Sequence, residues 1–110
     1  MKSESYTVRL SARSRVHVYF ERDKKKVVDF TVNCEIFHKK QKKWIPILRY
    51  DTAHDHLPKQ KYKMPHKHIL HNKRTEVIIK IRMRDYNQAL TIAYEDIHKN
   101  FRRIKYNFFI

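Results

Sequence analysis

The chain has 110 residues, with 26 lysines and arginines against 11 aspartates and glutamates, so its net charge at pH 7 is +15. This length suits one domain, and we expect residues 1–110 to form a single domain. Hydrophobic residues make up 41% of the chain, which is too much for an intrinsically disordered protein. Cys34 is the one cysteine, so a disulfide-stapled secreted domain is excluded. The excess of positive charge favours polyanionic partners.

Two further classes of protein are excluded by the pattern of apolar residues and by the lack of glycine. No apolar run approaches the roughly 20 residues that a membrane span needs. The first residues, 1–5, lack the apolar core of a signal peptide, so we expect a cytoplasmic protein with no membrane partner. The chain contains no glycine, which rules out Gly-rich phosphate loops of the Walker A type.

Apolar and polar residues alternate through the first third of the chain, over residues 6–10, 16–20 and 28–36. Period-two alternation predicts strands with one buried face and one wet face. Turns are expected at 23–25 and 38–43, and further strands at 44–50, 66–70 and 76–82, the last two joined by a turn at 71–75. Residues 51–65 have no sustained period and contain two prolines, which indicates an ordered surface loop.

The C-terminal part changes to helical spacing. Its apolar residues recur at steps of three and four: Tyr86, Leu90, Ala93, Ile97, Phe101 and Ile104. Asp85, with Gln88 three positions later, resembles a capping box at the start of an amphipathic helix. We therefore predict an α+β fold, an antiparallel β-sheet of five to six strands with one C-terminal helix packed on one face.

Positive charge is concentrated in residues 38–84, which contain 14 lysines and arginines, three acidic residues and six of the eight histidines. One interpretation is a solvated basic face, and the other is a surface that binds phosphates. Aromatic and sulfur-containing residues that could stack on unpaired bases lie among the cations: Trp44, Tyr50, Tyr62 and Met64. Candidate substrate-binding residues in this segment are His54, His56, Lys59, Lys61, Lys63 and Lys67. Charge alone does not choose between RNA, DNA and an acidic protein partner.

The tripeptide at 66–68 is the most distinctive local feature. In a strand, His66 and His68 point to one face, roughly 6–7 Å apart, while Lys67 points to the other. Two imidazoles can act as general base and general acid in one reaction, and nearby cations favour the neutral base form. The same pair could instead bind Zn²⁺, with His54, His56 or Asp51 as further ligands, or could have a structural role.

Residues 49–54, Arg-Tyr-Asp-Thr-Ala-His, are followed by a proline-containing loop and by Pro-His-Lys-His at 65–68. This arrangement resembles the TumE family of toxins from prokaryotic toxin–antitoxin pairs, with Thr52 where the family usually has asparagine. The resemblance implies a toxin encoded beside a small antitoxin, often one with a helix-turn-helix, and a suspected ribonuclease activity.

Our sequence-based hypothesis is a toxin that acts as a metal-independent endoribonuclease, without a cofactor. Its catalytic residues would be His66, His68, Asp51, Arg49 and Tyr50. The histidines would share the acid and base roles, and Asp51 would orient one imidazole. Arg49, or Lys67 if the backbone bends locally, would stabilise the charge developing on the phosphate. Tyr50 would stack on a base or bind a phosphate. The alternatives are a non-catalytic module that binds nucleic acid or an acidic partner, and histidines that only stabilise the fold.

Overall fold

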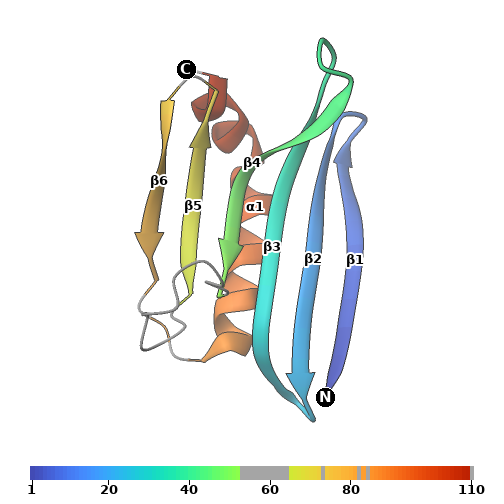
Figure 1. Cartoon of the computed structure of the whole chain (residues 1–110), viewed down its shortest axis with the longest axis vertical. Helices are drawn as coiled ribbons and strands as arrows, with labels where there is room; N and C mark the ends of the chain where they lie inside the picture. Colours follow the sequence, from blue (N-terminus) through green and yellow to red (C-terminus); the bar gives the residue numbers. More distant parts are fainter. Residues whose placement is uncertain (53–64, 73, 82, 84, 110) are drawn as a thin grey trace.

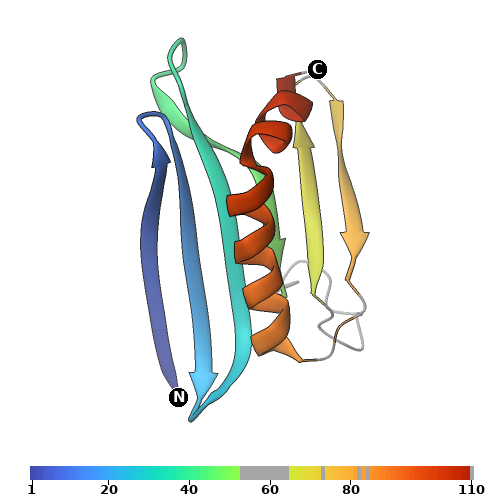
Figure 2. The same ribbon diagram turned by 180° about the vertical axis from the view of Figure 1, so that it is seen from behind.

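The computed structural model describes residues 1–109 except 53–64, 73, 82 and 84. Its elements are β1 (Lys2–Ser11), β2 (Ser14–Asp23), β3 (Lys26–His38), β4 (Lys43–Asp51), β5 (His66–His71), β6 (Arg74–Lys80) and α1 (Tyr86–Phe109). The described strands form one antiparallel sheet whose spatial order follows the chain, from β1 to β6 (Figure 1). The helix crosses one face of this sheet (Figure 2). The predicted α+β fold is thereby confirmed.

The alternating residues of β2 and β3 supply much of the core. Val16 and Val18 of β2 lie opposite Cys34 and Val32 of β3, and all four side chains are fully buried. Burial raises the pKa of the Cys34 thiol to about 12, so this residue packs as an apolar group and is not reactive at neutral pH. The period-two pattern therefore predicted these strands and the face that β2 and β3 bury. In β1, where the same pattern predicted a buried face, Tyr6 is 46% exposed and no residue is buried.

Two turns contain a residue with positive φ, Lys24 at 56° and Lys42 at 52°. Glycine usually occupies such positions, but this chain has none. Each lysine therefore adopts a left-handed conformation that costs an L-residue roughly 1–2 kcal/mol. Both residues lie in the turns predicted at 23–25 and 38–43.

The helix begins where the sequence predicted. The Oδ1 atom of Asp85 accepts hydrogen bonds from the backbone N–H groups of Asn87 and Gln88, at 3.0 and 3.3 Å. The buried side chains of α1 are Ala89, Ala93, Ile97 and Phe108, while Tyr86, Leu90, Phe101 and Ile104 are partly buried against the core. The centre of the buried stripe thus runs through Ala89, one residue before Leu90. Among the described residues, no helix is long and apolar enough to cross a membrane.

Replacing Ile97 by alanine is expected to lower the free energy of unfolding by about 2–5 kcal/mol, because the side chain is fully buried and would leave a cavity. Thr91→Ala, on the exposed face of α1, should change it by less than about 0.5 kcal/mol. Urea denaturation of both variants measures the difference. Equal losses would show that the two faces of α1 are wrongly assigned.

Candidate functional site

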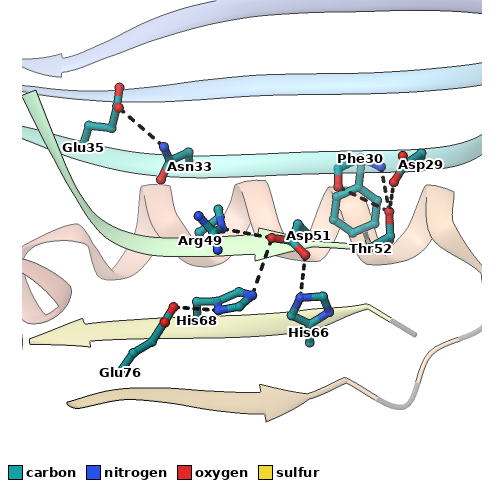
Figure 3. A network of polar contacts seen from close by, with 10 residues as sticks. All are labelled: Asp29, Phe30, Asn33, Glu35, Arg49, Asp51, Thr52, His66, His68 and Glu76. Atoms are coloured by element: carbon teal, nitrogen blue, oxygen red, sulfur yellow. Dashed lines mark hydrogen bonds and ion pairs between the residues drawn. The ribbon is translucent and has the colours of Figure 1, made fainter. Parts of the chain in front are cut away.

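The pairing of β4 with β5 brings the sequence-predicted acid and histidines together. Asp51 at the end of β4 lies opposite His66 at the start of β5, and Arg49 lies opposite His68. Their side chains lie on the sheet face away from α1 (Figure 3). We call Asp51, His66 and His68 the Asp–His–His cluster. The strand alternation that puts both histidines on one face also puts the carboxylate beside them.

The cluster is compact and almost inaccessible to solvent. The Nε2 atom of His66 lies 2.5 Å from Oδ1 of Asp51, and Nε2 of His68 lies 3.6 Å from Oδ2. The two imidazole centroids are 4.6 Å apart, closer than the spacing expected from an extended strand alone. The exposed fractions are 6% for Asp51, 2% for His66 and 3% for His68. Such buried ionisable groups are stable only when paired, as they are here.

Two partly exposed residues connect the cluster to the surface. The Nε atom of Arg49 lies 2.9 Å from Oδ2 of Asp51, and Nδ1 of His68 lies 2.7 Å from Oε1 of Glu76 on β6 (Figure 3). The side chains of Arg49 and Glu76 are 36% and 41% exposed. Our sequence analysis did not identify Glu76. Its position two residues from Ile78, which lies opposite His68, places it on the same sheet face.

The protonation states follow from this environment. Burial raises the pKa of Asp51, but His66, His68 and Arg49 together lower it below its usual value, so the group is a carboxylate at neutral pH. Burial and then the charge of Arg49 lower the pKa of His68, against the opposing effects of Asp51 and Glu76. His68 is therefore favoured in its neutral form.

The contacts assign different chemistry to the two rings. The Nδ1–H group of His68 donates to Glu76, which leaves the lone pair on Nε2 as a base. The Nε2 atom of His66 faces the Asp51 carboxylate at hydrogen-bonding distance, an environment that favours a proton on that nitrogen. The cluster thus holds one imidazole against Glu76 and the other against Asp51.

The same residues could hold a metal ion. One ligand atom from each of Asp51, His66 and His68 lies within 4.8 Å of the others, and two imidazoles with one carboxylate suit Zn²⁺. The contact of Glu76 with the second nitrogen of His68 is also typical of metal-binding histidines. Zinc ligands in a tetrahedral site lie roughly 3.4 Å apart, so binding would require the cluster to contract. The zinc alternative raised by the sequence therefore needs a rearrangement of these three side chains.

The structure does not bring Tyr50 and Lys67 to the cluster. Both point to the helix side of the sheet, where the Tyr50 hydroxyl donates to Asp96 of α1 and Lys67 Nζ lies 3.3 Å from the same carboxylate. Lys67 also lies 5.4 Å from the centre of the Tyr50 ring. Burial and the bond to Asp96 raise the pKa of Tyr50. β5 shows no local bend that would turn Lys67 toward the histidines, because its register with β4 is continuous.

The other predicted binding residues lie outside the described residues: His54, His56, Lys59, Lys61 and Lys63. Thr52, which directly follows Asp51, is fully buried and accepts a hydrogen bond from the Phe30 N–H at 3.0 Å. Its hydroxyl also donates to Asp29 on β3 (Figure 3). Thr52 therefore attaches the chain to β3 immediately after the cluster's carboxylate.

These features define an antiparallel α+β domain with a C-terminal helix on one sheet face and a buried Asp–His–His cluster on the other. The chain belongs to a family described as a domain of unknown function, DUF7718, whose model matches residues 1–109. Comparison with curated proteins and with solved structures found no match.

The lowered pKa of His68 predicts a pH dependence of stability. Between the folded pKa and the unfolded value near 6.5, the unfolded chain binds more protons, so stability rises with pH. The contribution is complete above pH 6.5 and is lost as pH falls through the folded pKa. The stability difference between the wild type and His68→Gln should therefore shrink over this window, as measured by urea denaturation between about pH 8 and 5. A constant difference would contradict the assignment, and His98→Gln, on the exposed side of α1, is the control.

Proposed function

We propose that this protein is a basic, toxin-type domain that binds RNA and cleaves it with the Asp–His–His cluster as its acid–base centre. One observation carries the proposal. Two segments of the motif, one ending β4 and one beginning β5, bring a carboxylate and two imidazoles into mutual contact on one sheet face. A base, an acid and a nearby guanidinium are the groups that RNA cleavage requires, because RNA supplies its own nucleophile, the 2′-OH.

Each group has a defined role in the proposed reaction. Nε2 of His68 takes the proton of the 2′-OH as its oxygen attacks phosphorus. His66 acts as an imidazolium beside the Asp51 carboxylate, gives a proton to the departing 5′ oxygen and becomes neutral. The products are a 2′,3′-cyclic phosphate and a 5′-hydroxyl. Arg49 stabilises the charge that develops on the phosphate, and Asp51 holds His66 in place. Because both rings are nearly buried, the reaction requires substrate binding to uncover them.

RNA binding is supported by the distribution of charge. The turn between β3 and β4 exposes Lys39, Lys40 and Lys42, and the start of β4 exposes Lys43. On the other side of the sheet from the cluster, the outer side of α1 exposes Lys99, Arg102 and Arg103. We expect sequence-tolerant binding of single-stranded RNA that weakens with salt, with each neutralised phosphate contributing about −0.7 to the slope of log K against log salt concentration. Fluorescence anisotropy over a range of salt concentrations measures this slope. A slope near zero would contradict a polyanionic partner.

By its resemblance to toxin–antitoxin pairs, the protein would also bind a small antitoxin in the cytoplasm.

The decisive experiment is single-turnover cleavage of a labelled RNA by the purified chain, with and without a chelator. We expect cleavage that resists chelation and leaves cyclic phosphate ends. Tight binding without cleavage would contradict the enzymatic proposal and favour a binding module. Loss of cleavage on chelation would assign Asp51, His66 and His68 to a metal site.

A structural role for the cluster is the second candidate, and the burial of the rings favours it. The contacts of His68 with Asp51 and Glu76 connect β4, β5 and β6, so the cluster also stabilises this end of the sheet. If this is its whole role, His68→Gln will lower the free energy of unfolding and leave the activity of each folded molecule unchanged.

A further inference from the structure

Among the described strands, β6 forms one edge of the sheet and carries an unusual run of exposed apolar residues. Val77, Ile78 and Ile79 are 46%, 55% and 46% exposed. β1 forms the other edge (Figure 1) and carries charged residues such as Lys2 and Glu4, which discourage pairing between molecules. An edge strand with exposed aliphatic residues is a template for the addition of another strand.

The direction of the backbone groups on β6 follows from one hydrogen bond. The N–H of Ile81 donates to the carbonyl of Pro65 at 2.8 Å, which turns the backbone groups of residue 81 toward β5. Successive residues of an antiparallel strand direct these groups to opposite neighbours. The N–H and C=O groups of Ile78 and Lys80 are therefore directed to the free edge. Those of Glu76 follow the same alternation, and Glu76 lies next to the point where the register between β5 and β6 shifts, between Ile69 and His71.

The sequence of this strand is complementary to itself. In an antiparallel pair of β6 strands centred on Ile78, each Val77 lies opposite Ile79 and each Glu76 lies opposite Lys80. One face then carries two Val–Ile pairs, and the other carries an Ile–Ile pair between two Glu–Lys pairs. Cross-strand pairs of these kinds stabilise sheets. The residues with outward backbone groups lie directly opposite one another, which allows hydrogen bonds across the whole stretch.

We propose that β6 is a dimer interface on which a second copy of this chain adds as an antiparallel strand. The charges of residues 76–80 favour a second copy, because this stretch carries one acid and one base that match their counterparts in an antiparallel pair, and an acidic strand would oppose Glu76; Arg74 adds a further cation at the start of β6. The pairing also brings Lys80 of the partner subunit beside Glu76, which contacts Nδ1 of His68. The interface would therefore adjoin the Asp–His–His cluster. The proposal does not depend on whether the protein cleaves RNA.

A charge-exchange experiment tests the register. Lys80→Glu would place two carboxylates opposite each other at both ends of the strand pair, and Glu76→Lys would place two ammonium groups there. Each variant should therefore raise the dimer dissociation constant at least about tenfold. In an equimolar mixture of the two variants, the mixed dimer has an acid opposite a base at both ends of the strand pair, so mixing should restore the dimer if the register is correct. Sedimentation velocity at about 0.15 M salt, where the Debye length is roughly 8 Å, reports the masses.

The doubly exchanged variant, with Glu76→Lys and Lys80→Glu in one chain, completes the test of the register. It restores an acid opposite a base at both ends of the pair and should form the dimer again. Lys2→Glu on β1 makes the same change in net charge as Lys80→Glu at the opposite edge, and should leave the dimer intact.

Because Glu76 contacts His68, the fold of Glu76→Lys is checked by circular dichroism, while Lys80→Glu provides an independent test at an exposed position. A wild type that stays monomeric at about 50 µM, where a specific pair with a micromolar dissociation constant would be dimeric, would overturn the proposal. A dimer that survives both single variants would overturn it too.

Discussion

Replacing His68 by glutamine is expected to slow single-turnover RNA cleavage at least about 100-fold, because a positioned base typically contributes roughly 10²–10⁴ to such a rate. His68 is the base in the proposed reaction, since Glu76 occupies its Nδ1 and burial with Arg49 lowers its pKa. His66→Gln should have an effect of similar size through loss of the acid. RNA affinity should change less than about threefold, because the exposed cations supply most of the binding energy.

The control for these variants is His98→Gln, which makes the same chemical change at an exposed position of α1. It should cleave at the wild-type rate. Rates are compared per folded molecule, with the folded fraction taken from circular dichroism. Full activity in both His66→Gln and His68→Gln would contradict the acid–base assignment, and the two histidines would then have a structural role.

The fold was predictable because each element has a strong period in the sequence. The valines of β2 and β3 alternate with polar residues, and α1 repeats its apolar residues at steps of three and four. Finer details depend on tertiary packing. The close approach of α1 to the sheet selects the small Ala89 and Ala93 for the buried stripe, and turns Leu90 to its margin. The turn between β5 and β6 is shorter than predicted, because His71 and Arg74 pair with each other as the last residue of β5 and the first residue of β6.

The site was predictable in part for the same reason. Strand alternation places His66 and His68 on one face, and antiparallel pairing adds Asp51. The hypothesis also grouped Tyr50 with these residues because they are neighbours in the motif. Neighbours in a strand point to opposite faces, so Tyr50 contacts the helix instead. Glu76 could not be assigned, because its position depends on the register between β5 and β6, which shifts near Ile69.

Replacing Asp51 by asparagine is expected to lower the free energy of unfolding at pH 7 by about 3 kcal/mol. Removing one member of a buried ion pair typically costs about 3–5 kcal/mol, and the partial exposure of Arg49 places this case at the lower end. Asparagine keeps the shape of the side chain but loses the charge that faces Arg49 and His66. Urea denaturation measures the loss.

The matched control and the pH dependence separate this effect from a general loss of packing. Glu4 contacts Arg22 at 3.1 Å on the surface, with side chains 48% and 35% exposed, so Glu4→Gln should cost less than about 1 kcal/mol. The folded pKa of Asp51 lies below the unfolded value of 3.8, so its contribution is complete above pH 3.8 and is lost as pH falls through the folded pKa. The difference between the wild type and Asp51→Asn should therefore shrink below pH 3.8. A difference that persists unchanged at lower pH would mean that the carboxylate's charge does not stabilise the cluster.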